Sequence, residues 1–179
     1  MSKFEHIKDK FIRESLEEYK GPIDSAKPDG LSVSNYKVEK PWGHELWLAS
    51  NHNDSKYALK EIFIKSPHAS SIQFHEIKEE TNYVLSGEGE LLLSAKPIDI
   101  EKFKNNQYPD EELKKIIDGL ISHKLSSGSV FHVKPGFVHR VISTNDLKMV
   151  ETSTLHLDDV FRILDESGRG HGKIDSEHK

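Results

Sequence analysis

The hydrophobic positions of the chain change their spacing near residue 33. From there on, short runs of β-branched and aromatic residues alternate with polar positions and are separated by glycine, proline and polar turns. This alternation is typical of β-strands that bury one face. The predicted strands cover residues 33–38, 45–49, 57–64, 71–74, 81–85, 88–94, 129–133, 138–143 and 148–154. Many short strands joined by turns indicate an all-β sandwich or barrel.

The N-terminal residues follow a different pattern. Apolar side chains recur at roughly helical spacing with charged residues between them, at Phe4, Ile7, Phe11, Leu16 and Tyr19. The pattern predicts an amphipathic helix that caps the barrel or packs on a partner subunit. The turn residues from Gly21 to Gly30 then indicate an irregular linker.

A polar insertion is predicted at about residues 95–126, between the strands. Pro109 to Leu113 has the character of a helix start, and an apolar face follows at Ile116, Ile117, Leu120 and Ile121. The insertion either covers the mouth of the barrel or packs against the outer sheet. Packing is favoured because apolar helix faces are usually buried.

The domain organisation follows from these elements. At 179 residues the chain is long enough for one domain with a buried core. We expect an N-terminal helix and linker over 1–37 and a barrel over 38–165 that contains the insertion. Residues 166–179 are polar and contain glycine, which predicts a flexible C-terminal tail.

Composition excludes several classes of function. Cysteine is absent, so disulfides, thiolate metal sites and cysteine nucleophiles are excluded. A net charge of -5 without a basic cluster argues against a nucleic-acid partner, although a small anionic substrate needs only one or two local cations. No apolar run has the length of a membrane span or a signal-peptide core, which predicts no membrane partner and a cytoplasmic location.

Four side chains that can bind a metal lie in two short motifs. Gln73 and His75 are two residues apart in a predicted strand, so they leave the same face of the sheet. Glu80 follows His75, and His139 ends the downstream motif. Each lies in an apolar segment bounded by glycine, so a closed β-structure would bring all four around one centre. Gln73 is the weakest member and alternatively bonds a metal-bound water or a neighbouring group.

These motifs resemble the two motifs of the cupin family, whose small β-barrel holds a metal on a His-x-His-x4-Glu segment and a later histidine. Glutamine replaces the first histidine here. The resulting Gln-His-Glu-His set is similar to the zinc ligands of phosphomannose isomerases, including their cupin-type relatives. Further similarities span about residues 38–169, at Lys40-Pro41-Trp42-Gly43, Ser71-Ile72-Gln73, Pro135-Gly136-x2-His139-Arg140, Asp158 to Asp165, and Gly168-Arg169.

The resemblance implies a jelly-roll barrel, or double-stranded β-helix, with metal-dependent aldose–ketose isomerase activity. The implied reaction interconverts mannose 6-phosphate and fructose 6-phosphate through an enediol. It implies one divalent metal, with zinc first and manganese, iron, cobalt or nickel as alternatives. A sugar phosphate is the implied partner, and cupins are often dimers, so we expect a homodimer. Ile77 stands where the family commonly carries a further histidine, which leaves the reaction open.

Lys78 is the first candidate for a catalytic residue. It lies two residues before Glu80, where the family often carries a basic residue, and isomerisation needs a group that moves a proton or contacts the substrate. The alternative is an exposed lysine that pairs with Glu76 or Glu79.

Glu151 and Lys60 are further candidates on predicted strands. Glu151 aligns with an acidic residue of the family and is either the acid–base group or a partner of His139 or Lys60. Lys60 shares a strand face with Ala58, Ile62 and Ile64, so it needs an anionic partner if that face is buried. A substrate phosphate would serve, and an internal pair with Glu90 or Glu151 is the alternative.

Arg140 and Tyr83 are the remaining candidates for substrate binding. Arg140 follows His139, so strict alternation directs it to the other side of the sheet and favours a structural role. Tyr83 and His132 lie close to the motifs, and the direction of His132 cannot be inferred across the turn that separates it from His139.

Other cupin functions stay open. His75, Glu80 and His139 also fit the ligand set of an Fe(II) oxygenase, with Gln73 outside it. A sugar isomerase or epimerase with a different substrate is a further alternative, as is a non-catalytic sugar-binding cupin. The fold alone does not discriminate among them, because one scaffold hosts many chemistries.

Overall fold

The computed structural model describes residues 36–50 and 55–177. These residues belong to one compact unit, Asn35–Lys179. The helix expected at residues 4–19 and the linker up to Gly30 lie outside the described residues.

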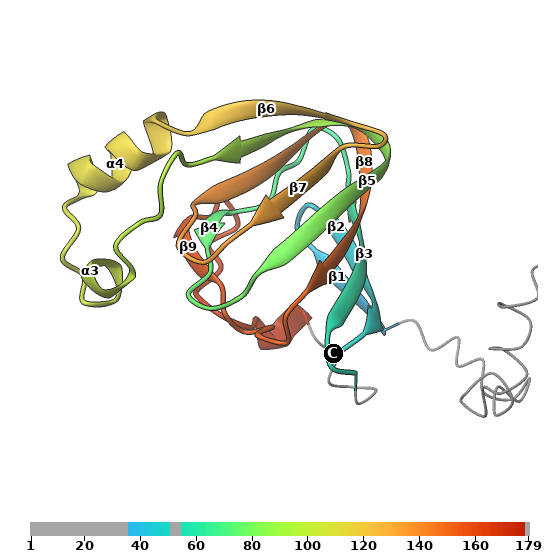
Figure 1. Ribbon diagram of the computed structural model, residues 1–179, viewed down its shortest axis with the longest axis horizontal. Coiled ribbons are helices and arrows are strands. Elements are labelled where there is room, and N and C mark those ends of the chain that lie inside the picture. Colours follow the sequence, from blue (N-terminus) through green and yellow to red (C-terminus); the bar gives the residue numbers. More distant parts are fainter. Residues whose placement is uncertain (1–35, 51–54, 178–179) are drawn as a thin grey trace, which may run out of the picture. The chain divides into compact units, whose positions relative to one another are not determined.

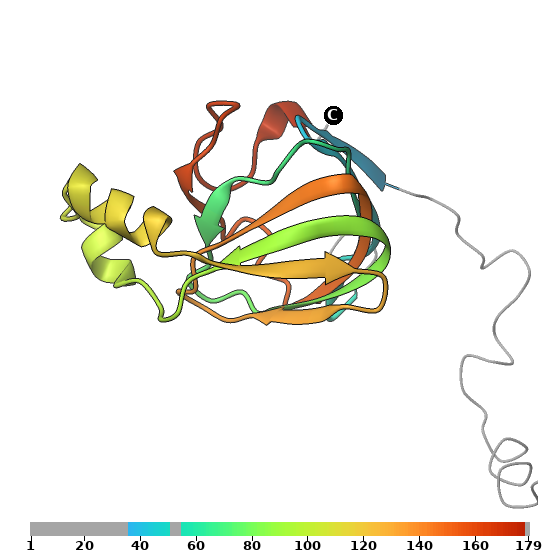
Figure 2. The same cartoon turned by 90° about the horizontal axis from the view of Figure 1, so that it is seen from above.

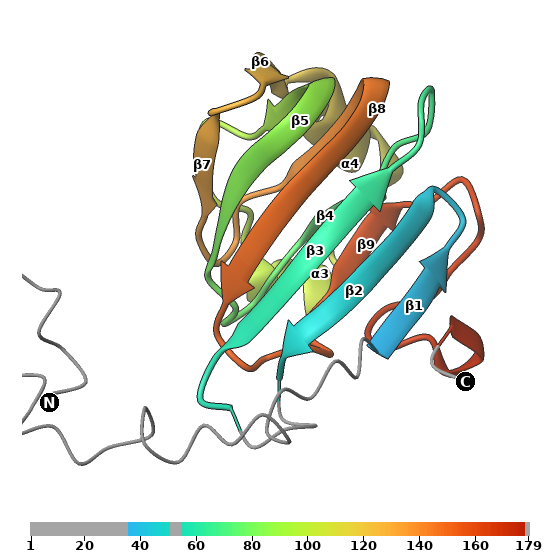
Figure 3. The same cartoon turned by 90° about the vertical axis from the view of Figure 1, so that its right-hand side faces the viewer.

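The described residues form one curled antiparallel sheet of nine strands (Figure 1). The strands are β1 (Tyr36–Lys40), β2 (Gly43–Ala49), β3 (Ala58–Ile64), β4 (Ile72–Phe74), β5 (Glu80–Leu93), β6 (Ile121–Ser126), β7 (Val130–Val133), β8 (His139–Ser153) and β9 (Phe161–Leu164). Their order is β1-β2-β3-β8-β4-β9, and β5 pairs with β8, β6 and β7. Figure 2 shows the strands wrapped around a common interior, and Figure 3 shows β1, β2, β3, β8 and β5 as one twisted layer. The predicted all-β barrel is confirmed.

Strands β5 and β8 are each one long strand where the sequence predicted two. The register between them shifts near the middle of β5, where Gly87 has a φ of +86°. A Cβ atom on Gly87 would lie 2.1 Å from the carbonyl oxygen of Asp146, so only glycine fits this bend. Because β8 is long and curved, His139 at its start and Glu151 near its end contact the same buried Lys78–Glu80 pair.

Burial alternates along the strands and divides the interior into an apolar and a polar part. On β3, Ala58, Lys60, Ile62 and Ile64 are all buried, as strand alternation predicts. The apolar core contains Trp42, Ile62, Ile64, Val84, Leu91, Leu125, Phe131, Val133, Val141, Leu147 and Met149. The polar part contains Lys60, His75, Lys78, Glu80, Asn82, His139 and Glu151.

The insertion forms two short helices, α3 (Ile100–Lys104) and α4 (Asp110–Asp118), followed by β6. Their apolar side chains join a second core cluster built on Ile72, Phe74, Ile98 and Val138. Phe103 of α3 packs edge-to-face on Phe74, with ring centroids 5.0 Å apart. The insertion thus packs on the sheet and does not line the interior pocket, in agreement with the favoured alternative. No helix in the described part of the chain is long and apolar enough to cross a membrane.

The C-terminal residues lie against the barrel, whereas the sequence predicted a flexible tail over 166–179. Arg169 pairs with Asp165 at 2.6 Å and with Glu177 at 3.4 Å. Glu177, in the short 3-10 helix Asp175–Glu177, also accepts a hydrogen bond from Lys40 of β1 at 2.8 Å. These ion pairs hold the segment up to residue 177 on the edge of the sheet. The polar composition of the segment gave no indication of them.

Candidate metal centre

His75, Glu80 and His139 converge inside the barrel. His75 directly follows β4, Glu80 opens β5 and His139 opens β8. The Nε2 atoms of His75 and His139 lie 3.5 Å and 3.6 Å from the two carboxylate oxygens of Glu80. Their potential ligand atoms all lie within 4.8 Å of one another, and all three residues are buried. The predicted ligands from two distant motifs therefore meet at one point.

Both histidines bond the backbone through Nδ1, so their Nε2 atoms are the ones that can bind a metal. His75 Nδ1 bonds the carbonyl of Asp159, and His139 Nδ1 lies 3.1 Å from the carbonyl of Phe137. A carbonyl only accepts hydrogen bonds, so each Nδ1 carries the proton and each Nε2 presents a lone pair. His75 Nε2 is buried and has no hydrogen-bond partner among the described residues. A divalent ion satisfies such an orphaned acceptor, so the residues present fit a metal.

Gln73 lies beside this group. It is paired with His139 in the sheet, and its Nε2 is 3.5 Å from His139 Nε2. Its Oε1 accepts a hydrogen bond from Ser71 Oγ at 2.6 Å. To serve as a fourth ligand, the amide must rotate so that its oxygen faces the histidines. Its NH₂ group then donates a hydrogen bond to Ser71 Oγ, because a hydroxyl oxygen can also accept.

Asp159 fixes the turn between His75 and Glu80. Besides its carbonyl bond to His75, its carboxylate accepts the backbone N–H groups of Glu76, Ile77 and Lys78 at 2.8, 2.6 and 2.8 Å. Burial alone would raise the pKa of Asp159, but these three bonds lower it below its usual value. Sequence reasoning placed Asp159 in a family-like closing segment and assigned it no role.

Lys78 is buried between two carboxylates. It is only 4% exposed, and its Nζ lies 2.7 Å from Glu80 and 2.8 Å from Glu151. Burial alone would lower the pKa of Lys78, but Glu151 and Glu80 raise it well above its usual range. Burial likewise opposes ionisation of Glu80, yet the Lys78 ammonium holds its pKa well below the usual range. The alternative of an exposed surface lysine therefore does not describe this side chain.

The pKa of His139 is also shifted. Burial lowers it to about 4, and the neighbouring Glu80 carboxylate only partly opposes this effect. His139 is therefore neutral at pH 7 and keeps the Nε2 lone pair that a metal needs.

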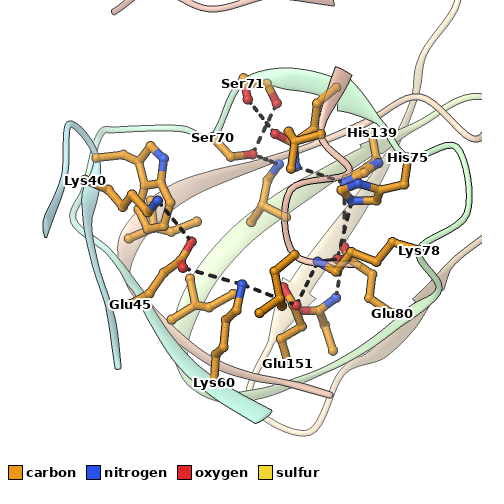
Figure 4. A pocket seen from close by; sticks show the side chains of 18 of the residues that line it. Lys40, Glu45, Lys60, Ser70, Ser71, His75, Lys78, Glu80, His139 and Glu151 are labelled. Carbon is orange, nitrogen blue, oxygen red and sulfur yellow. Dashed lines mark hydrogen bonds and ion pairs between the residues drawn. The ribbon is translucent and has the colours of Figure 1, made fainter. Parts of the chain in front are cut away.

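Lys60 and Glu45 extend this buried group of charges across the pocket (Figure 4). Lys60 Nζ lies 3.5 Å from Glu45 and 3.9 Å from Glu151, and 4.5 Å from the centre of the Trp47 ring. The expected internal partner Glu151 is thus present, whereas Glu90 bonds Ser122 instead. Sequence reasoning missed Glu45, because only the pairing of β2 with β3 brings it to Lys60.

These side chains line one pocket, which the C-terminal segment also borders. The cationic lining residues are Lys40, Lys60, Lys78, Arg162, Arg169 and Lys173, and the carboxylates are Glu45, Glu80 and Glu151. The side chain of Lys173 is 46% exposed, which places it at the opening. A polar pocket with metal ligands at one wall and cationic side chains in its lining suits a small hydroxylated anion.

The other candidates lie elsewhere. Arg140 pairs with Glu166 at 2.5 Å, and Tyr83 is 46% exposed on the outer face of β5. Neither lines the pocket in the described residues. His132 is exposed and lies 2.8 Å from Thr81 Oγ1, away from the metal ligands.

No protein-family model and no curated protein matches the chain. Solved structures do resemble it. The polyketide cyclase RemF from Streptomyces resistomycificus is 15% identical, with a TM-score of 0.50 over 73% of this chain and 78% of that chain. Ectoine synthase from P. lautus is 11% identical, with a TM-score of 0.52 over 79% and 92% of the two chains.

A single-residue variant of oxalate decarboxylase from B. subtilis is 9% identical, with a TM-score of 0.54. The match covers 73% of this chain but 30% of that longer one. At such identities the likeness establishes architecture alone, and activity has to be argued from the site. Together with the curled antiparallel sheet, these neighbours show that the chain has the cupin barrel fold.

Proposed function

We propose that the protein is a metal-dependent aldose–ketose isomerase that interconverts mannose 6-phosphate and fructose 6-phosphate. The observation that carries the proposal is the buried Lys78–Glu151 pair, which lies beside the metal ligand Glu80. A proton donor and a proton acceptor next to a Lewis-acid site are what this reaction needs. The structural neighbours include other enzymes built on the same fold.

His75, Glu80 and His139 are the residues that would hold the metal, with Gln73 as a fourth ligand after its amide turns. The ion, which we propose to be zinc, supplies a Lewis acid that polarises the sugar carbonyl and stabilises the negative charge that develops on its oxygen. Manganese, iron, cobalt and nickel accept the same nitrogen and oxygen ligands.

Lys78 and Glu151 then move the protons. The Glu151 carboxylate takes the proton from C2 of the aldose and returns it to C1, so the carbon-bound proton is conserved. The Lys78 ammonium gives a proton to O1 and recovers one from O2, and its raised pKa keeps it protonated between turnovers. Ser153 donates a hydrogen bond to Glu151 at 3.0 Å, which holds the carboxylate in place.

The cations at the rim provide for the phosphate. Arg162 of β9 lines the pocket together with Arg169 and Lys173 of the C-terminal segment, and Lys173 is half-exposed at the opening. Arg162 Nε is buried without a hydrogen-bond partner among the described residues. A guanidinium with a free N–H group is suited to a phosphate oxygen.

The test is a coupled assay for fructose 6-phosphate formation on protein that has been stripped with a chelator and given back one metal at a time. Turnover that returns with zinc supports the proposal. The turnover restored by each of the other ions shows which of them can replace zinc. Stoichiometric metal binding without turnover with any ion contradicts it and leaves another sugar or a non-catalytic sugar-binding role.

A second candidate function is an Fe(II) oxygenase. It is favoured by the hydrogen bond from Ser71 that engages the Gln73 oxygen and leaves two histidines and one carboxylate as the ligand set. Oxygen uptake that depends on Fe(II), together with inactivation in air, would distinguish this function from isomerisation.

Homodimeric assembly and a cytoplasmic location are parts of the proposal that rest on the family resemblance and composition. Sedimentation velocity at micromolar concentration measures the assembly state. A single species with the mass of one chain would contradict the dimer.

A further inference from the structure

Glu45 is a buried carboxylate that the proposed proton transfers do not use. It lies on β2, outside both metal motifs, and lines the pocket. Its Oε2 accepts a hydrogen bond from the Trp47 indole at 2.7 Å and lies 3.5 Å from Lys60 Nζ. Burial alone would raise the pKa of Glu45, but the ammonium groups of Lys60 and Lys40 help to lower it to about 2. The carboxylate is therefore ionised at neutral pH.

The other oxygen of Glu45 still has bonding capacity. Within residues 36–50 and 55–177, no hydrogen bond reaches Oε1, and Lys40 Nζ is 3.9 Å away. Lys60 Nζ also has unused bonding capacity. It lies 3.5 Å from Glu45 and 3.9 Å from Glu151 and makes no hydrogen bond to a described residue. Buried polar groups are ordinarily hydrogen-bonded, so this acceptor and this donor are available to a ligand.

The local charge points to neutral groups on that ligand. Lys60 lies between Glu45 and Glu151, so two carboxylates surround one ammonium. Lys40 and Lys78 also pair with these two carboxylates, so the positive charge of Lys60 is already balanced. A balanced group of charges has no surplus cation for a phosphate and argues against the phosphate role expected for Lys60. The Trp47 ring next to Lys60 adds an apolar surface, and alternating polar groups and aromatic surface match the hydroxyl and C–H faces of a sugar.

We propose that Glu45 and Lys60 bind two neighbouring hydroxyl groups of a sugar and thereby select among sugar epimers. Glu45 accepts a hydrogen bond from one hydroxyl, and Lys60 donates to the other. This inference rests on the proposed function, which places C1 and C2 of the sugar at the metal centre. The hydroxyls on C3, C4 and C5 take no part in the reaction of the open chain, and those on C3 and C4, which lie nearest the reacting carbons, are the ones we assign to Glu45 and Lys60.

Steady-state kinetics with mannose 6-phosphate and its 3-deoxy and 4-deoxy derivatives test the assignment. We expect the wild type to discriminate against at least one deoxy compound by about 10- to 100-fold in kcat/KM, because a site that bonds a hydroxyl is left with unpaired groups when the hydroxyl is missing. Glu45→Gln should raise KM for the parent sugar more than it changes kcat, and it should abolish the discrimination against the deoxy compound that lacks the hydroxyl bound by Glu45.

Glu90→Gln is the matched control, because Glu90 is also a strand glutamate but bonds Ser122 outside the pocket. It should keep both KM and the discrimination. A purely structural role of Glu45 would lower activity toward the parent and the deoxy compounds alike. Equal kcat/KM of the wild type for all three compounds would overturn the inference without reliance on any variant.

Binding measurements separate this inference from the proposed function. Titration calorimetry of zinc-loaded protein with D-mannose and D-fructose needs no turnover. A loss of affinity of about tenfold or more in Glu45→Ala, with wild-type affinity in Glu90→Gln, supports the hydroxyl site even where the isomerase assay is negative. Equal affinities of wild type and Glu45→Ala, or no binding of either sugar to the wild type, would overturn it.

Discussion

Asp159 holds His75 in place through its backbone carbonyl and the turn that follows His75 through its carboxylate. The two residues are far apart in the sequence: His75 follows β4, and Asp159 lies in the segment between β8 and β9. The carbonyl fixes which ring nitrogen of His75 carries the proton, and the carboxylate fixes the backbone that leads to Glu80. Asp159 is therefore a positioning residue for the metal centre.

We expect Asp159→Asn to lower zinc affinity by about 10- to 100-fold, because groups that orient a metal ligand have effects of this size. The backbone carbonyl that bonds His75 remains in this variant, so the fold should persist. Competition with a chromophoric chelator measures the affinity. Asp158→Asn is the control, since Asp158 is exposed, and equal zinc affinity of both variants would contradict the role of Asp159.

Removal of the metal should destabilise the protein. Zinc at 1,000 times its Kd stabilises a folded state by about 4.1 kcal/mol, which corresponds to a rise in Tm of about 8–16 °C for a chain of this size. His139→Ala should lose this rise, bind less metal and lose turnover, and Glu80→Gln should behave alike. His156→Ala is the control, because His156 is exposed and bonds Thr154. Turnover retained in His139→Ala would contradict the site.

The sequence was sufficient to predict structure where burial follows from the local alternation of side chains along a strand. The side chains of Ala58, Lys60, Ile62 and Ile64 were predicted to share a face, and all four are buried on one side of β3. The sequence was insufficient where tertiary pairing decides the structure. Residues 144–147 were interpreted as a break between two strands, but pairing with β5 keeps β8 continuous there.

The same limit explains which site residues were missed. Glu45 reaches Lys60 only through the register of β2 with β3, and Asp159 reaches His75 only through the path of the chain after β8. Neither has a local sequence signal. Arg169 was expected in a flexible tail because ion pairs with Asp165 and Glu177 leave no periodic pattern.

Lys78→Ala should lower kcat by about 10²- to 10⁴-fold while zinc stays bound, because it removes the proposed proton donor but no metal ligand. It should also lower the free energy of unfolding by about 3–5 kcal/mol, since Glu80 and Glu151 lose their buried partner. Stopped assays and chemical denaturation measure the two effects. Lys104→Ala, which removes an exposed pair with Glu76, is the control. An unchanged kcat would remove Lys78 from the mechanism.

Gly87→Ala should be strongly destabilising, whereas Gly168→Ala should have a small effect. Both glycines have positive φ, +86° and +69°, so the backbone penalty of about 1 kcal/mol is common to both. Only at Gly87 would the new Cβ lie 2.1 Å from a backbone oxygen, while nothing lies within 4 Å at Gly168. Urea denaturation compares the two variants. Equal losses of stability would show that β5 and β8 adjust around Gly87 without cost.

The ion pair between Arg169 and Asp165 should keep the C-terminal segment on the pocket in a pH-dependent way. Burial alone would raise the pKa of Asp165, but the hydrogen bonds from Arg169 lower it. A carboxylate whose folded pKa is depressed stabilises the fold above its unfolded pKa, about 3.9, and loses this contribution as the pH falls through the folded value. The segment should therefore be held at neutral pH and released in acid.

Arg169→Ala should release the segment at neutral pH as well. The readout is hydrogen exchange of the Gly172 amide, which donates to the Val160 carbonyl at 2.8 Å. This amide is protected from exchange while the C-terminal segment lies against the barrel. We expect faster exchange in Arg169→Ala than in Arg140→Ala, whose partner Glu166 is exposed. Because Gly172 and Lys173 line the pocket, the same variant should raise KM for a sugar phosphate. Unchanged exchange would show that contacts other than the Arg169 pairs hold the segment.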